Sequence, residues 1–217
     1  DPGLDFDVVV VDGGSGDGSV EAIRSELDAM GAPDWIALMP LPLNGGFAWA
    51  NNQALMQIMQ REKPPRYVAL INPDTEVAPG ALRALADVLD RNPKVAAVGS
   101  QLVDPDGTLS GSAFRFPSIA QEFVRGANTA AIGRLLGVPS TVIRRAEAGP
   151  AEWVTGASVM LRVEALREVG LFDEGFFLYF EEVELMWRLR KAGWELWFQP
   201  DSKVVHVGGA ATGVVDG

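Results

Sequence analysis

The chain contains no cysteine and only one histidine among its 217 residues. Without thiols there can be no disulfide framework and no thiolate metal site. Lysine and arginine number 18 against 29 aspartates and glutamates, which gives a net charge of −11. That charge argues against a nucleic-acid groove or an anionic membrane surface as the main partner. The sequence also lacks any run approaching the roughly 20 apolar residues of a membrane helix.

What is present describes a globular protein, with 47% hydrophobic and 22% charged residues. This length suits one sizeable domain and is too short for two comfortable ones. A ligand that carries a diphosphate would need a metal ion to offset the protein's negative charge. The missing cysteines fit a reducing compartment, so we expect a cytoplasmic location, with contact at the inner face of the membrane as a further possibility.

Apolar runs alternate with helical patterns along the first hundred residues. Val8–Val11 and Tyr67–Ile71 are continuous runs typical of strands buried on both faces of a parallel sheet. Apolar side chains recur at helical spacing in residues 20–30, 47–60 and 79–89. The alternation predicts an α/β fold whose mostly parallel, Rossmann-like sheet is flanked by helices.

The second half of the chain is less regular. Val154–Leu161 is predicted to be a strand and Val163–Val169 a short helix. Two short strands are expected near the end, at Glu195–Phe198 and Lys203–Val207. A helix is possible at Gly126–Gly137.

Three carboxylates stand together where an aromatic run, Phe176–Phe180, leads into a helix. They are Glu181, Glu182 and Glu184. We expect the aromatic side chains to desolvate these carboxylates partly, which would raise a carboxyl pKa and give a better base near neutral pH. One glutamate would then serve chemistry, while Glu184 would pair with Arg188 one turn later.

Polar residues also follow two predicted strands, and ligands of an open parallel sheet bind at the carboxyl ends of its strands. The loop after Asp12 matches neither nucleotide-binding motif of the G-x-G-x-x-G or P-loop type, because Ser19 replaces the third glycine and no lysine is present. Asn72-Pro73-Asp74 ends the other strand. Magnesium and manganese prefer oxygen ligands and accept phosphate oxygens for the rest. The alternative is that both segments are ordinary turns, with Asp12 and Asp17 as caps.

Four ordered stretches resemble the inverting family 2 glycosyltransferases, most closely their rhamnosyltransferase-like members, and they cover nearly the whole chain. These stretches are Val8–Val20, Asn44–Leu55, Leu70–Val77 and Leu171–Trp194. The resemblance implies a GT-A nucleotide-diphospho-sugar transferase fold in a single domain of residues 1–217, with a nucleotide-binding half (1–100) and an acceptor and catalytic half (101–217). In the family a first strand and helix precede the strand matched by Val8–Val11. We expect that unit to be absent here, either lost by truncation or supplied by another chain.

The resemblance also implies roles for individual residues. The nucleotide would be bound by Asp12, Gly14, Asn44, Gly46 and Asn72. The metal ion would be bound by Asp74 and His206. The sugar or the acceptor would be contacted by Trp153, Thr155 and Gly156. Glu182 matches the family's second acidic position and would be the catalytic base, with Glu181 as the second candidate. The metal would be Mn²⁺ or Mg²⁺. His206 could instead be a packed side chain and Trp153 part of an ordinary buried strand. Asn51 and Asn52 could cap the helix or pack inside it.

The activity expected from this resemblance is inverting transfer of a sugar from dTDP-rhamnose or a UDP-sugar to a hydroxyl of a glycan or lipid-linked acceptor. Two other classes of function remain open. The chain could be a module that binds a nucleotide sugar without turnover. It could also be a nucleotidyltransferase, but that class needs a basic glycine-rich loop, and Gly13–Gly18 has no lysine or arginine.

Overall fold

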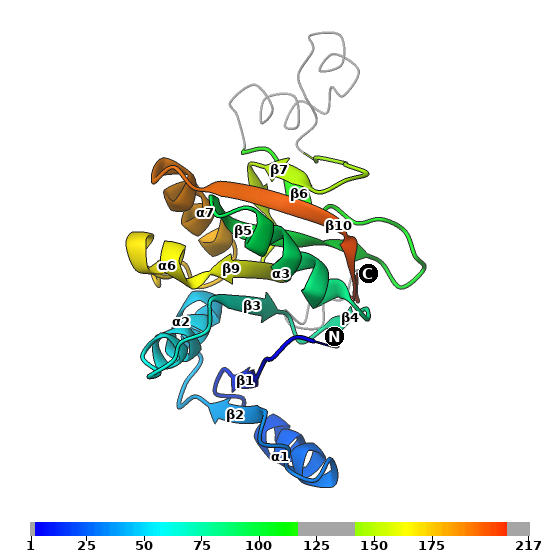
Figure 1. The fold of residues 1–217 in the computed structure, drawn as a ribbon. Coiled ribbons are helices and arrows are strands. Elements are labelled where there is room, and N and C mark those ends of the chain that lie inside the picture. Colours follow the sequence, from blue (N-terminus) through cyan, green and yellow to red (C-terminus); the bar gives the residue numbers. More distant parts are fainter. Residues whose placement is uncertain (1–2, 117–141, 208–217) are drawn as a thin grey trace, which may run out of the picture.

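A six-stranded mixed sheet forms the centre of the molecule in the computed structural model, which describes residues 3–116 and 142–207 (Figure 1). The strand order is β3-β9-β5-β10-β4, and β7 pairs with β10 beside this path. In that order the bounds are Tyr67–Ile71, Ser158–Arg162, Val95–Val103, Glu195–His206, Thr75–Val77 and, for β7, Gly149–Ala151. The helix expected at Gly126–Gly137 lies outside the described residues.

Two strand pairs and five helices complete the described structure. The parallel pair is β1 (Val8–Asp12) with β2 (Ile36–Pro40), and the antiparallel pair is β6 (Ala113–Phe114) with β8 (Trp153–Val154). The helices are α1 (Ser19–Ala29), α2 (Gly46–Met59), α3 (Ala81–Arg91), α6 (Val163–Val169) and α7 (Glu181–Lys191). The α/β class is therefore confirmed.

The expectation of a mostly parallel sheet is wrong. Only one pair of neighbouring strands in the described central sheet, β5 and β10, is parallel, whereas β9 pairs antiparallel with both β3 and β5, and β10 pairs antiparallel with β4 and β7. Val159–Leu161 in β9 is fully buried, so it forms the same continuous apolar run as a parallel strand. An apolar run shows that a strand is buried and carries no information about its direction.

The end of the chain also differs from the prediction. One strand of 12 residues, β10, replaces the two short strands that were expected. Its register against β5 shifts between Gln199 and Lys203, around Pro200, which has no N–H to donate to the ladder. An irregularity inside one strand thus looked like a gap between two.

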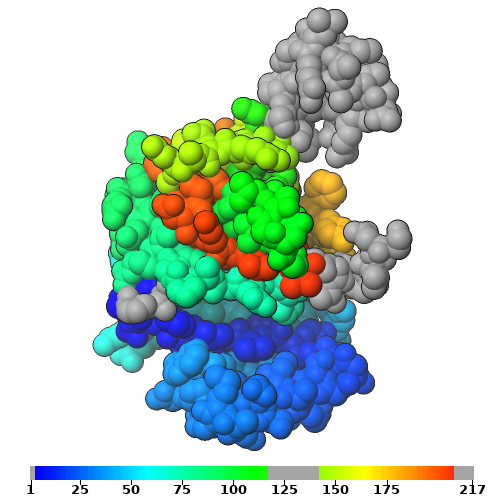
Figure 2. Space-filling model, turned by 90° about the vertical axis from the view of Figure 1, so that its right-hand side faces the viewer, coloured from blue at the N-terminus to red at the C-terminus, as the bar shows by residue number. Residues whose placement is uncertain are grey.

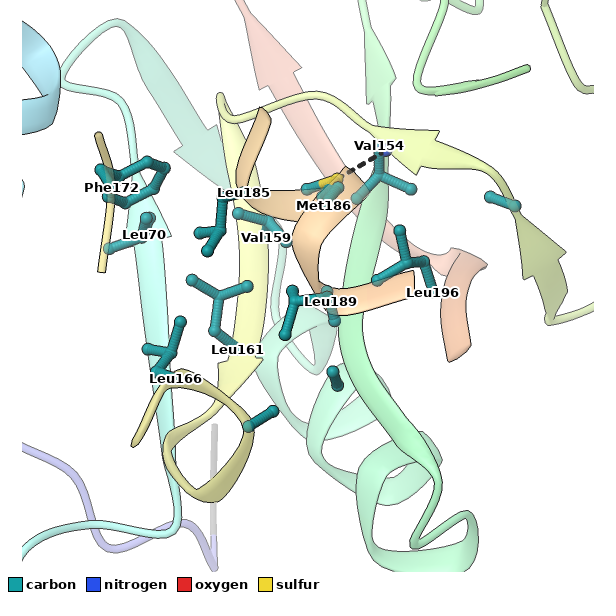
Figure 3. Packing of buried hydrophobic residues seen from close by; sticks show 14 of the residues in the cluster. Leu70, Val154, Val159, Leu161, Leu166, Phe172, Leu185, Met186, Leu189 and Leu196 are labelled. Atoms are coloured by element: carbon teal, nitrogen blue, oxygen red, sulfur yellow. Dashed lines mark hydrogen bonds between the residues drawn. The ribbon is translucent and has the colours of Figure 1, made fainter. Parts of the chain in front are cut away.

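Helix α7 is fixed to the sheet by its apolar face (Figure 3). Leu185, Met186 and Leu189 are at most 1% exposed, and they pack toward side chains of β9 and β10. The backbone N–H of Val154 also donates to the sulfur of Met186, at 3.2 Å. Burial of each of these three apolar side chains contributes about 1.5–3 kcal/mol to stability. The start of α7, with its three glutamates, is therefore anchored relative to β8 and β9.

The unit formed by β1, α1 and β2 lies at one end of the molecule, where it appears blue in Figure 2. Helix α1 contains no buried residue. Helix α2 begins six residues after β2, and it contacts β1. The loop after β1 therefore belongs to a peripheral unit that α2 connects to the main body.

Candidate active site

The loop after β1 is closed by Asp12, which is 6% exposed. Its Oδ1 accepts hydrogen bonds from the backbone N–H groups of Gly14, at 3.1 Å, and Ser15, at 3.0 Å. Hydrogen bonds from the side chain and then the backbone of Ser15 hold the pKa of Asp12 below its ordinary value. A Cβ on Gly14, where φ is +81°, would lie 2.6 Å from the carbonyl carbon of Leu43. This loop therefore packs directly on the backbone that precedes Asn44.

Asp17 caps the turn before α1, as in the alternative interpretation of this loop. Its Oδ1 accepts hydrogen bonds from the N–H and the hydroxyl of Ser19, at the first residue of α1. Asp12 also closes a turn, but its carboxylate lies at the carboxyl end of a strand, where a ligand could approach.

The loop before α2 contacts the segment that leads into α7. Asn44 Oδ1 accepts a hydrogen bond from Gly46 N–H, at 3.0 Å. Gly46 has a φ of +87°, and a Cβ there would lie 2.3 Å from the carbonyl oxygen of Phe177. The same oxygen accepts a hydrogen bond from Phe47 N–H, at 3.2 Å. Only a residue without a side chain permits this contact, so Gly46 joins the predicted nucleotide loop to the approach to α7.

Glu181 and Glu182 begin α7 in a desolvated setting. Glu181 is 4% exposed, and its Oε2 is buried without a hydrogen-bond partner. Burial raises the pKa of Glu181. It also raises the pKa of Glu182, where the neighbouring Glu181 charge adds to the effect. A Cβ on Gly156 would lie 3.6 Å from the Cβ of Glu182 and 3.8 Å from the ring of Phe47. The predicted base thus adjoins Gly156.

The aromatic run that precedes these glutamates is mostly exposed. Phe177, Tyr179 and Phe180 are 61%, 58% and 63% exposed, so more than half of each of these residues faces solvent. Tyr179 and Phe180 have φ values of +68° and +71°, a strained conformation for bulky residues that redirects the chain before the helix.

The predicted pair of Glu184 and Arg188 is present. Arg188 Nε lies 2.7 Å from Glu184 Oε1, and Nη2 lies 2.7 Å from Oε2. Arg188 also donates to the carbonyl oxygens of Val169, at 2.7 Å, and Leu171, at 2.6 Å. Glu184 is therefore a structural residue that orients an arginine.

Asp74 and His206 lie together at the end of the sheet. The side chain of Asp74 is 4% exposed, and its Oδ1 lies 3.4 Å from His206 Nε2. No hydrogen bond reaches that buried oxygen. A carboxylate oxygen without a partner beside an imidazole nitrogen suits Mn²⁺ or Mg²⁺, which would take further ligands from phosphate and water. Among the described residues, no group of three or more metal-ligating side chains is present.

The remaining predicted residues lie on β8 and in the turns near it. Asn72 N–H donates to the carbonyl oxygen of Ala157, at 2.9 Å, so the turn after β3 meets the segment that carries Gly156. Thr155 Oγ1 accepts from Ala157 N–H, at 3.3 Å. Trp153 stacks on Phe114 with ring centroids 4.2 Å apart, and a sugar could reach only its opposite face.

Comparison with known proteins identifies the family of the chain. The model of the glycosyl transferase family 2 matches residues 2–170. The chain belongs to this family. Over 218 aligned residues it is 32% identical to an N-acetylglucosaminyl-diphospho-decaprenol L-rhamnosyltransferase of Mycobacterium tuberculosis, covering 95% of this chain and 68% of that protein. It is 24% identical to rhamnosyltransferase WbbL of Escherichia coli, over 74% of this chain and 60% of that protein. It is thus a rhamnosyltransferase-like member.

Two solved structures show the same fold. GalNAc-T7 with UDP, GalNAc and Mn²⁺ has a TM-score of 0.65 at 16% identity, over 93% of this chain and 37% of that one. The mannosyltransferase PcManGT from Pyrobaculum calidifontis, with GDP-Man and Mn²⁺, has a TM-score of 0.59 at 20% identity, over 93% of this chain and 47% of that one. The GT-A fold is confirmed. In the described part of the chain, no helix is long and apolar enough to span a membrane.

Sequence reasoning left one residue of this region undecided. The sequence leaves Asn52 open as a cap or a packing residue of the helix, whereas its buried amide bonds to Phe172 and Glu174 ahead of α7. The only signal for this contact was a polar residue on the apolar side of a predicted helix.

Proposed function

We propose that this chain transfers a sugar, with inversion, from a nucleotide diphosphate donor to a hydroxyl of a glycan or lipid-linked acceptor. The observation that carries the proposal is the position of Glu182. Its side chain adjoins Gly156, and Phe47, which follows the predicted nucleotide loop, contacts the same glycine position. The identity to the mycobacterial rhamnosyltransferase supports dTDP-rhamnose as the donor, with UDP-sugars as the next choice.

In this proposal Glu182 takes the proton of the acceptor hydroxyl. The acceptor oxygen forms a bond to the anomeric carbon while the bond from that carbon to the diphosphate oxygen breaks, and the electron pair leaves with the diphosphate. Attack from the face opposite the leaving group inverts the configuration. The raised pKa of Glu182 makes its carboxylate a stronger base near neutral pH. Glu181 is the second candidate for this role.

The donor would be held by residues of the first hundred positions. Asp12 would accept a hydrogen bond from a pyrimidine ring N–H, while Asn44 and Asn72 would bond to polar groups of the nucleotide. Gly14 and Gly46 would let the backbone approach it closely. Residues 101–217 would supply the acceptor side, with Thr155 and Gly156 near the sugar and Trp153 as an apolar surface for a pyranose ring.

Asp74 and His206 would hold the divalent ion. When bound, Mn²⁺ or Mg²⁺ would offset the charge of the diphosphate and stabilise it as a leaving group. Calorimetric titration with dTDP and UDP, each with and without Mn²⁺, tests this assignment. Asp74→Asn should weaken nucleotide binding only when Mn²⁺ is present. Equal weakening with and without the ion would contradict a metal role for Asp74.

The decisive experiment compares Glu182→Gln with Glu184→Gln, a variant in the same helical turn. Loss of a general base lowers the rate by about 10²–10⁴-fold. Glu182→Gln should therefore lose transfer and keep nucleotide binding, whereas Glu184→Gln should keep transfer and lose stability with its Arg188 pair. Proton NMR of the product's anomeric centre reports the stereochemistry. Undiminished transfer by Glu182→Gln would move the base to Glu181. Nucleotide binding by wild-type protein without transfer to any acceptor would favour a binding module.

A further inference from the structure

Asn52, in the middle of α2, carries a buried amide that reaches out of its own helix. The residue is 4% exposed. Its Nδ2 donates to the carbonyl oxygen of Phe172, at 2.9 Å, and to Glu174 Oε1, at 2.8 Å. Its Oδ1 accepts a hydrogen bond from Phe172 N–H, at 3.1 Å. Both amide protons and the amide oxygen therefore make hydrogen bonds, to residues 120 and 122 positions further along the chain.

The neighbouring residue shows that this pattern is not general to the helix. Asn51 Nδ2 donates to the carbonyl oxygen of Phe47, at 2.9 Å, which is a bond within α2. Asparagine in a helix interior competes with the helix for backbone hydrogen bonds, so its use needs a compensating contact. Asn51 satisfies itself locally, whereas Asn52 holds another segment.

Two further contacts join the same two parts of the molecule. Phe47 N–H donates to the carbonyl oxygen of Phe177, at 3.2 Å. The rings of Phe47 and Phe172 pack edge to face, with centroids 6.0 Å apart. The first two turns of α2 therefore grip residues 172–177 at both ends. The nucleotide loop lies at the head of α2, and α7 with Glu182 follows the gripped segment.

We infer that Asn52 is a positioning residue that holds residues 172–177, and through them the start of α7, in register with the nucleotide loop at the head of α2. This inference rests on the proposed function for its catalytic consequence. The chain enters α7 through Tyr179 and Phe180, both in the left-handed conformation. Such a conformation persists only when the surrounding structure determines it, and the Asn52 bonds fix its upstream end.

The test uses an isosteric variant, a local control and a rescue. Asn52→Asp keeps the acceptor for Phe172 N–H, removes both donors and places a carboxylate against Glu174. The double variant Asn52→Asp/Glu174→Gln restores a side-chain bond, because the glutamine amide can donate to the aspartate. Asn51→Asp is the matched control, since it changes the adjacent residue in the same way without touching residues 172–177.

We expect Asn52→Asp to lower kcat by about 10–100-fold, the loss that accompanies misplacement of a catalytic group by about 1 Å. KM for the donor should change by less than about threefold, because the nucleotide loop itself is intact. The double variant should recover most of kcat, and Asn51→Asp should match the wild type. If Asn52→Asp reduced kcat only in proportion to its unfolded fraction, or if the double variant gave no rescue, the positioning role would be wrong. If Asn52→Asp does not fold, the test is the comparison of kcat between the double variant and Asn51→Asp.

A second readout separates this inference from the proposed function. Amide hydrogen exchange of residues 172–180 needs no substrate, so it reports on the clamp even if the wild-type chain transfers no sugar. Exchange in this segment should accelerate in Asn52→Asp, slow again in the double variant, and stay at the wild-type level in Asn51→Asp. Unchanged exchange in Asn52→Asp would overturn the inference whatever the activity.

Discussion

Gly46→Ala should damage the protein through one interatomic contact, and the damage can be estimated from the structure. A left-handed φ costs a residue with a Cβ about 1–2 kcal/mol, and the φ of Gly46 is +87°. The added Cβ would lie 2.3 Å from the oxygen of Phe177. That oxygen would have to move by roughly 1 Å to reach an ordinary C···O contact of about 3.3 Å.

Such a shift would break the hydrogen bond from Phe47 N–H, which adds about 0.5–1.5 kcal/mol. The expected loss of unfolding free energy is therefore about 1.5–3.5 kcal/mol. It would also displace the approach to α7, and a displacement of about 1 Å near chemistry can cost about 100-fold in rate. Sugar transfer should fall to that extent in the folded variant.

The assay is urea unfolding of Gly46→Ala beside Gly80→Ala, followed by transfer kinetics under conditions where both variants are folded. Gly80 has a φ of +84°, but a Cβ there would meet nothing within 4 Å. Gly80→Ala therefore reports the backbone term alone, about 1–2 kcal/mol, and should keep its transfer rate. Equal destabilisation by the two substitutions, with transfer retained in Gly46→Ala, would refute the idea that Gly46 is required for close approach to Phe177.

Three other predictions rest on separate contacts. Burial raises the pKa of Glu181 above its ordinary value of 4.5, so the folded state holds this proton to higher pH than the unfolded chain does. The free energy of unfolding should therefore fall as pH rises from the unfolded-state pKa through the folded-state pKa. Urea titrations across pH 4–8 should show a flatter dependence of unfolding free energy on pH for Glu181→Gln, and an unchanged dependence would contradict the burial of this charge. Arg162 donates to the carbonyl oxygens of Val95 and Leu89, at 2.8 and 2.7 Å, so Arg162→Lys should lower the unfolding free energy by about 1.5–3 kcal/mol. Arg167→Lys alters one long, exposed hydrogen bond and should leave stability nearly unchanged. Similar losses from both substitutions, measured by urea unfolding, would show that the planar guanidinium of Arg162 is unimportant. Gly14→Ala should weaken binding of dTDP or UDP by about tenfold, or about 1.4 kcal/mol, because its Cβ would meet the Leu43 backbone at 2.6 Å, while Gly16→Ala, where a Cβ meets nothing within 4 Å, should not.

Local pattern was enough to predict the helices around the site. The asparagine-rich helix expected at residues 47–60 is α2, and the acidic helix after the aromatic run is α7. Their apolar faces repeat with helical spacing, and a repeat of that kind depends only on near neighbours in sequence. The direction of β9 depends instead on which strands it lies between, and nothing in Ser158–Arg162 encodes that.

The site was predicted to a similar limit. The family resemblance assigned Asp74 and His206 to the same metal site, and the structure brings their side chains within 3.4 Å. Residue type did not predict how far Phe177, Tyr179 and Phe180 are exposed to solvent. An aromatic run gives no warning of two left-handed residues, because bulky side chains rarely adopt that conformation. The contact between Asn52 and Phe172 spans 120 residues, and no local pattern reports on such a distance.

Buried polar atoms without hydrogen bonds occur at two of the residues proposed for the site. Among the described residues, the buried side-chain polar atoms without a partner are Asp74 Oδ1 and Glu181 Oε2. A buried unsatisfied group costs about 1–3 kcal/mol, and more when it is charged, so a chain of ordinary marginal stability retains few of them. Both belong to the residues proposed for chemistry, one for the metal and one beside the base. A cation bound at Asp74 would satisfy its buried oxygen, and a proton on Glu181 would lower the cost of burying that carboxylate, so both unsatisfied atoms lie where a ligand or a proton is expected to act.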